Sequence, residues 1–257
     1  MSTPILQALK RALGLSMALA VVLSGSLSLP TKVFADNSYS NDSPPTTNNR
    51  AGGSRGCDKP IASAQTAEDS SLILFSSMQT LGRTAETRPT LAWYVSNFVS
   101  SPMEFRLYEY DVASQKTTLV AEVKDKNFKS SPGIVLLSFS ESMPSLSIGK
   151  RYLWQVELIC DANSPSSNPF AEGEFKVVEG TPELQAQLAQ AQNPFERATV
   201  YVKAGLWYDA LATVLQTSMA EDDSRLQELR GLLLEKATVG EDEIQQINQS
   251  FITQVQP

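Results

Sequence analysis

The carboxylates on the predicted strands are the residues with which this chain could perform acid–base chemistry. A glycoside hydrolase needs two carboxyl groups across a cleft, roughly 5 Å apart in retaining enzymes and roughly 6.5–9.5 Å apart in inverting ones. The alternation of the strands favours a simpler interpretation, in which these acids point to solvent; Glu157, for example, falls on the face opposite Trp154. The candidates are Glu104, Glu109, Asp111, Glu157 and Asp161.

The absence of histidine removes most other catalytic chemistry. The chain of 257 residues contains no histidine and 2 cysteines. Ser-His-Asp and Cys-His catalysis, the HExxH zinc site and an imidazole pH switch are therefore excluded. Structural zinc sites need more Cys or His ligands than two cysteines supply, and no EF-hand spacing is present. We therefore expect no catalytic residue, no metal and no cofactor, and we favour a binding role over an enzymatic one.

The charge and the N-terminal residues indicate location. A formal net charge of −7 argues against a nucleic-acid partner, because such binding relies on Lys and Arg that neutralise phosphates. Residues 1–35 are typical of a signal peptide: Lys10 and Arg11 precede an apolar stretch, and Val33 and Ala35 occupy the −3 and −1 positions. Gly and Ser interrupt that stretch, which is shorter than the ~20 residues of a membrane anchor. We expect cleavage after Ala35 and a periplasmic or extracellular protein without a membrane span.

Export makes a disulfide bond between Cys57 and Cys160 plausible. It would close a loop of about a hundred residues, for which the chain-entropy model gives roughly 4–5 kcal/mol. Two buried free thiols or bridges between molecules are the alternatives. Because Cys57 precedes the first predicted strand, the bond would tether the N-terminal arm to the end of the sixth strand.

Composition divides the rest of the chain. Residues 36–56 consist largely of Asn, Ser, Thr, Pro and Gly, which predicts a disordered linker. Residues 57–180 contain seven short runs of period-two alternation separated by turn signals, which predicts an antiparallel β-sandwich. Two details favour an immunoglobulin/fibronectin-like sandwich. Residues 89–93 are typical of its second strand, and Tyr152 is placed as a tyrosine corner at the entry to the sixth.

Residues 181–257 are predicted to be helical. Asn193 and Pro194 form a helix start with proline in the first turn. A spacing of small and large residues that resembles one tetratricopeptide helix pair follows, although a single pair is not a repeat array. Further helices are expected near 224–233 and over 241–255. The residues of the tetratricopeptide-like spacing are Ala198, Tyr201, Gly205, Tyr208, Ala210 and Leu211.

Four aromatic residues are candidates for binding. Tyr108 and Tyr110 share the outward face of a predicted strand, where they would stack on sugar rings or anchor a protein partner. Packing against cross-strand neighbours or beneath the helices is the alternative. Trp207 and Tyr208 are adjacent, so one should face the helix seam and the other the sandwich or a ligand.

A set of short segments carries a resemblance to a known family. The segments include 55–57, 89–95, 104–107, 149–154, 158–161 and 204–211. Together they resemble a secreted, mostly cyanobacterial family catalogued as domain of unknown function 928. The resemblance covers roughly residues 55–217 and implies secretion and a layout of strands followed by helices. It implies no activity, so it transfers no catalytic residue.

Two hypotheses for function follow from the sequence. The first is an exported, non-enzymatic cell-envelope protein that acts as a binding or adaptor module for protein partners. The second is a carbohydrate-active protein, either a sugar-binding module or a carboxylate-based glycoside hydrolase. The second hypothesis predicts exposed coplanar aromatic rings, or two carboxyl groups that face each other in a cleft.

Overall fold

The computed structural model describes residues 44–51, 72–77, 79–96, 100–125, 127–163, 166, 168–217, 224–237 and 241–255. All of them belong to one compact unit, Phe34–Pro257. The expected signal peptide and Cys57 lie outside the described residues. No helix within the described part of the chain is long and apolar enough to cross a membrane.

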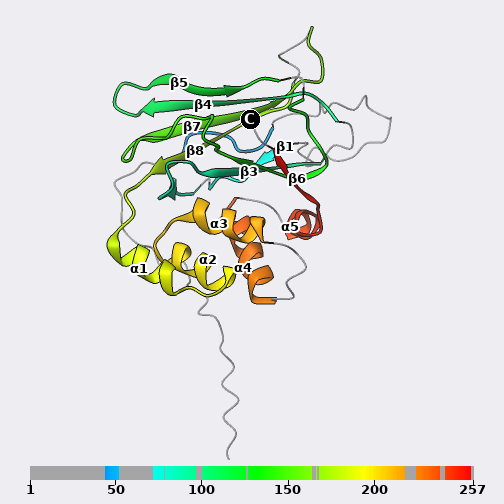
Figure 1. The fold of residues 1–257 in the computed structure, drawn as a ribbon. Helices are drawn as coiled ribbons and strands as arrows, with labels where there is room; N and C mark the ends of the chain where they lie inside the picture. Colours follow the sequence, from blue (N-terminus) through cyan, green and yellow to red (C-terminus); the bar gives the residue numbers. More distant parts are fainter. Residues whose placement is uncertain are drawn as a thin grey trace, which may run out of the picture. The chain divides into compact units, whose positions relative to one another are not determined.

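Two mixed sheets form the β-rich part of the fold (Figure 1). The four-stranded sheet has the order β1 (Leu72–Leu74), β3 (Thr90–Val95), β6 (Gly133–Ser138) and β9 (Ile252–Val255). The five-stranded sheet has the order β2 (Gly82–Thr84), β8 (Phe170–Val177), β7 (Arg151–Leu158), β4 (Met103–Asp111) and β5 (Lys116–Val123).

The prediction that all strands pair in an antiparallel way is wrong for β2 and β9. β2 pairs with β8 in parallel, and β9 pairs with β6 in parallel, whereas the other pairs are antiparallel. Parallel pairing needs a long connection between the two strands. The chain supplies one, because β9 returns to the sheet only after five helices.

Aromatic side chains fill the space between the sheets. Trp93 of β3 and Trp154 of β7 are both fully buried, with ring centroids 6.4 Å apart. Phe105 of β4 meets Phe139, just after β6, in an edge-on contact at 6.1 Å. The period-two pattern therefore predicts the inward face correctly. Tyr152 lies in the same core, and its hydroxyl accepts a hydrogen bond of 2.9 Å from the backbone N–H of Ser147.

The described residues after β8 form five helices: α1 (Pro182–Gln190), α2 (Pro194–Lys203), α3 (Trp207–Gln216), α4 (Ser224–Glu235) and α5 (Glu241–Asn248). The side chains of Thr181 and Asn193 cap α1 and α2, and proline stands in the first turn of each. Gly205 turns the chain between α2 and α3 at a φ of 71°, a left-handed conformation that favours glycine. The predicted single helix over 241–255 is wrong, because β-branched Ile252, Thr253 and Val255 pair with the edge of β6.

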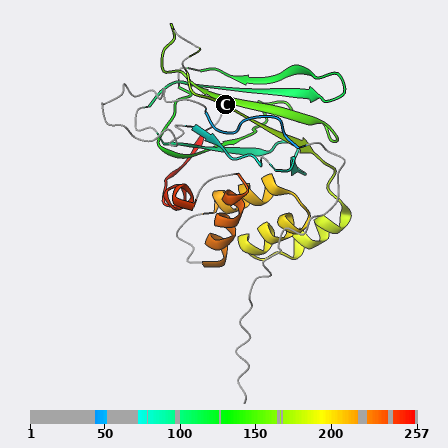
Figure 2. The same cartoon turned by 180° about the vertical axis from the view of Figure 1, so that it is seen from behind.

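Helix α3 packs against both sheets. It contacts both β2 and β3, and two opposite views show α1–α4 on the side of β3, with β4 and β5 on the far side (Figures 1 and 2). The ring of Tyr208 reaches inward to Phe175, with centroids 5.3 Å apart. A Cβ atom on Gly82 would lie 2.4 Å from that ring, so β2 needs glycine at this position.

Residues 44–51 differ from the expected disordered linker. Their backbone bonds to both sheets: Ala51 N–H donates to Leu72 at 3.0 Å, and the carbonyl of Asn48 accepts from Glu172 N–H at 2.9 Å. The Asn49 side chain is buried, and its amide lies 2.7 Å from the carbonyl oxygen of Ala237, at the end of α4. A polar composition predicts disorder only when the polar groups find no partners, and here buried carbonyls supply them.

Candidate functional site

A cavity of about 280 Å³ lies between the β2–β3 loop and helices α2 and α3. We call it the α2–α3 cleft. Its exposed rim includes Glu86, Arg88, Arg197 and Gln216, and its buried floor includes Thr84, Tyr201, Tyr208 and Asp209. The cleft thus combines charged groups at its mouth with a buried acid at its base.

Asp209, the third residue of α3, joins the helix to the loop. One carboxylate oxygen accepts a hydrogen bond of 3.0 Å from the Thr84 hydroxyl, and the other accepts one of 3.1 Å from the backbone N–H of Ala85. Only 5% of the residue is exposed. Burial raises the pKa of Asp209 to about 7, with a smaller contribution from the charge of Glu86, and the two hydrogen bonds oppose this shift.

Tyr201 lies beside the same charged groups. Burial raises the pKa of its phenol above the ordinary value, and the charges of Asp209 and Glu86 raise it further, while Arg197 opposes the shift. Burial likewise raises the pKa of Tyr208 to about 12. Both phenols are therefore neutral near pH 7, and Asp209 is the floor group whose charge changes in that range.

The rim carries more positive than negative charge. Arg88 comes from the β2–β3 loop and Arg197 from α2, and both are exposed. Within the described ranges, neither guanidinium forms an ion pair with a carboxylate. Glu86 is the acid that lines the rim beside them. The arrangement suits a polar or anionic group entering from solvent.

Trp207 and Tyr208 are buried, with 8% and 2% of each residue exposed. The Trp207 indole N–H donates to the carbonyl of Leu233 in α4 at 3.3 Å. The Tyr208 hydroxyl lies 3.2 Å from Ser76 Oγ and 3.4 Å from the Trp154 indole nitrogen. One ring therefore faces helix α4 and the other faces the two sheets, as their adjacency predicts. Tyr208 also lines the α2–α3 cleft.

Tyr108 and Tyr110 lie elsewhere, on the outer face of the five-stranded sheet. Both are half-buried. Tyr108 pairs across the strands with Leu153, and the guanidinium of Arg151 lies 5.6 Å from the ring centre of Tyr110. Packing against cross-strand neighbours, one of the two alternatives from sequence, describes this geometry. Their role in binding stays a prediction.

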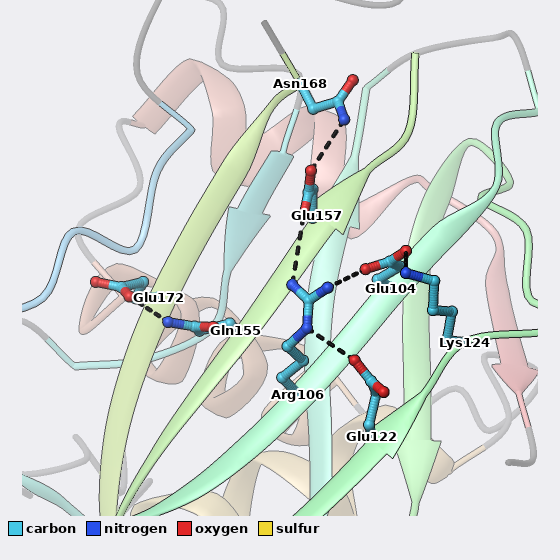
Figure 3. A network of polar contacts seen from close by, with 8 residues as sticks. All are labelled: Glu104, Arg106, Glu122, Lys124, Gln155, Glu157, Asn168 and Glu172. Carbon is cyan, nitrogen blue, oxygen red and sulfur yellow. Dashed lines mark hydrogen bonds and ion pairs between the residues drawn. The ribbon is translucent and has the colours of Figure 1, made fainter. Parts of the chain in front are cut away.

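The five candidate carboxylates lie in three places. Glu104 and Glu157 are on the outer face of the five-stranded sheet, Glu109 and Asp111 are near the end of β4, and Asp161 follows β7. Glu104 and Glu157 are cross-strand neighbours, and both bind Arg106 (Figure 3). Arg106 also binds Glu122 at 2.9 Å, and Lys124 binds Glu104 at 2.6 Å. We call these five residues the Arg106 network.

The remaining three candidate carboxylates also form ion pairs or hydrogen bonds within the protein. Glu109 binds Lys150 at 2.7 Å. Asp111 and Asp161 accept hydrogen bonds of 2.9 and 2.8 Å from Ala113 and Asn163 in local turns. The hydrogen bond from Ser114 is the main cause of a lowered pKa at Asp111. None of the five candidates lines the α2–α3 cleft. No group of His, Cys, Asp and Glu among the described residues is suited to hold a metal ion.

Cys160 lies just beyond β7. It is half-buried, and its backbone N–H donates to Asn168 Oδ1 at 3.0 Å. Because Cys57 lies outside the described residues, the bond between the two cysteines stays a prediction.

The sequence did not reveal the charged residues of the cleft. Glu86, Arg88 and Arg197 come from two segments that are distant in sequence, and exposed charges of this kind resemble ordinary surface residues. Asp209 lies in the first turn of a helix, where acids are common because they interact favourably with the helix dipole. One feature of the sequence could have indicated that Asp209 is buried. It is an acid within the otherwise apolar run Trp207-Tyr208-Asp209-Ala210-Leu211.

The fold is that of a β-rich protein with two mixed sheets and a set of C-terminal helices, and the cleft lies where α2 and α3 meet the β2–β3 loop. The chain belongs to the family described as Domain of Unknown Function (DUF928), whose model matches residues 50–248. No curated protein matches the sequence.

Among solved structures with a distant similarity, we describe one. It is the crystal structure of a LPMO from Kitasatospora papulosa, with 13% sequence identity and a TM-score of 0.27. The match covers 41% of this chain and 55% of that chain. A similarity this low carries no argument about fold or function.

Proposed function

We propose that the protein is an exported, non-enzymatic binding or adaptor module for protein partners in the cell envelope, and that the α2–α3 cleft is its binding site. The observation that carries the proposal is the cavity itself, which has charged residues at its mouth and buried polar groups at its base. Sites that recognise ligands combine a concave shape with a few fixed polar groups in this way. The signal-peptide pattern of residues 1–35 supports the exported location.

We also infer an immunoglobulin/fibronectin-like sandwich and a tetratricopeptide-like helix pair. The orders β1-β3-β6 and β8-β7-β4-β5 correspond to the A-B-E and G-F-C-C′ orders of immunoglobulin domains. The hydrogen bond from Ser147 N–H to the Tyr152 hydroxyl supports the predicted tyrosine corner. Fully buried Ala198 in α2 and the turn at Gly205 support a close pair between α2 and α3.

Site-specific photo-crosslinking in the producing cells tests the proposed function. A photoreactive amino acid at Gln216, on the rim, is compared with one at Lys116, an exposed residue of the β5 edge strand. We expect a discrete adduct with one envelope protein from Gln216 and none from Lys116. The purified partner should then bind the isolated protein. No adduct from the rim, or the same adducts from both positions, would contradict the proposal.

A carbohydrate-active function remains the second candidate, because two carboxyl-bearing residues, Glu86 and Asp209, line one cleft. Against it, both oxygens of Asp209 already accept hydrogen bonds, one from Thr84 of β2 and one from Ala85 of the following loop. Release of reducing sugar from envelope polysaccharides by wild-type protein, lost in Asp209→Asn and in Glu86→Gln, would favour hydrolysis. Unchanged polysaccharide would remove hydrolysis, and a wild-type protein that is also not retained on the same polysaccharides would remove the sugar-binding module.

A further inference from the structure

The α2–α3 cleft is small for a ligand site. Its volume of about 280 Å³ is at the lower limit of the roughly 300–1,000 Å³ found for pockets that enclose small molecules. A protein partner would therefore insert one side chain or one chain end, and the remaining contacts would form outside the cleft.

The charge of the cleft selects the kind of group that can enter. The chain as a whole carries a net charge of −7, yet the lining contains Arg88 and Arg197 against Glu86 and the buried Asp209. Guanidinium groups hydrogen-bond carboxylates with matching planar geometry, often through two parallel bonds. We propose that the cleft binds a carboxylate of the partner polypeptide through Arg88 and Arg197, and that ionisation of Asp209 weakens this binding. This inference rests on the proposed function.

The dependence on Asp209 follows from its place beneath the rim. The charged and titratable groups that line the cleft with it are Glu86 and Arg88 from the loop, Arg197 and Tyr201 from α2, and Tyr208 from α3. Both phenols have raised pKa values and stay neutral near pH 7. When Asp209 is protonated, the formal charge of the lining is positive. When Asp209 ionises, the lining becomes formally neutral and a second carboxylate is repelled.

The test uses fluorescent peptide pools and polarisation at low salt. Pools of random uncharged pentapeptides carry either a free C-terminal carboxylate or an amide. Two further amidated pools carry one internal Glu or, as its neutral match, one internal Gln. We expect binding by the free-carboxylate pool, the Glu pool or both, at least about 10-fold tighter than their neutral counterparts, as hydrogen bonds to charged groups imply. The pool that binds distinguishes a chain terminus from an acidic side chain.

Matched variants assign the binding to the cleft. Arg88→Gln with Arg197→Gln should weaken it roughly 10-fold or more. The double variant Lys116→Gln with Lys129→Gln removes the same charge from exposed positions outside the cleft and should leave the affinity within about 2-fold of wild type, since surface charges contribute little.

The pH dependence of binding tests the role of Asp209. The affinity of wild-type protein should weaken several-fold from pH 6 to pH 8. Asp209→Asn should bind at both pH values as wild type does at pH 6.

Three results would overturn the inference: no pool binds, neutral pools bind equally well, or the arginine and lysine variants lose affinity alike. If a partner still crosslinks at Gln216 while acidic and neutral pools bind alike, this inference fails and the proposed function stands. If no partner crosslinks at Gln216, the proposed function itself fails.

Discussion

Asp209 shows how a single buried carboxyl group makes the stability of a protein depend on pH. The folded protein keeps the Asp209 proton up to about pH 7, whereas the unfolded chain releases it near the ordinary value of 3.8. The folded state binds more protons between these values, so the unfolding free energy falls as pH rises, by at most about 1.4 kcal/mol per pH unit. The contribution is complete below pH 4 and is lost as the pH passes 7.

The substitution Asp209→Asn should remove this part of the pH dependence. Asparagine imitates the protonated acid, because its amide can donate to Thr84 and its carbonyl can accept from Ala85. Urea unfolding at pH 4.5, 6 and 8 measures the effect. The stability difference between variant and wild type should shift in favour of the variant by a few kcal/mol from pH 4.5 to pH 8. A difference that stays constant with pH would contradict the prediction.

Arg106 balances several acids on the outer sheet face. Its side chain is 24% exposed, and those of Glu104 and Glu157 are 10% and 16% exposed. Arg106→Gln should lower the unfolding free energy at pH 7 by about 1–3 kcal/mol, because it leaves these carboxylates without their shared cation. Glu122→Gln, at a side chain that is 39% exposed, should cost less than about 1 kcal/mol.

At the scale of elements, the contact between β2 and α3 depends on glycine at position 82, because the Tyr208 ring occupies the space that a side chain would need. Gly82→Ala would place Cβ 2.4 Å from the Tyr208 ring, which is held against Phe175 and Trp207. We expect urea unfolding to show a free energy of unfolding that is about 1–3 kcal/mol lower than in wild type. Gly231→Ala is the matched control, because it lies inside α4 with its nearest neighbour, Asn248, 4.0 Å away. It should gain about 0.5–1 kcal/mol from helix propensity. Equal effects would contradict the proposed role of Gly82.

The elements also show which parts of the fold were predictable. The inward face of β7 and the start of α2 follow from local patterns, namely alternation and an Asn-Pro cap, which act over a few residues. The strands β2 and β9 were missed because they are only 3 and 4 residues long and pair with strands distant in sequence. The cleft was missed for the same reason: its residues come together only when α3 closes against β2.

At the scale of the whole molecule, the predicted Cys57–Cys160 bond would tie the N-terminal arm to the end of β7. Mass measurement after alkylation should find no labelled thiol without reductant and two with it. Replacing both cysteines by serine should lower the unfolding free energy by up to about 5 kcal/mol. Two labelled thiols without reductant, or a covalent dimer on a non-reducing gel, would show that one of the alternatives holds instead.

Strand β9 completes the four-stranded sheet by pairing with β6. The sheet edge at β6 is completed only when residues 252–255 arrive, and Asn49 reaches its partner Ala237 only once α4 has formed. Contacts between such distant segments slow folding, because the chain must close long loops before it gains their energy. We expect an emerging chain to expose the β6 edge until β9 docks, and to rely on protection from aggregation during that interval.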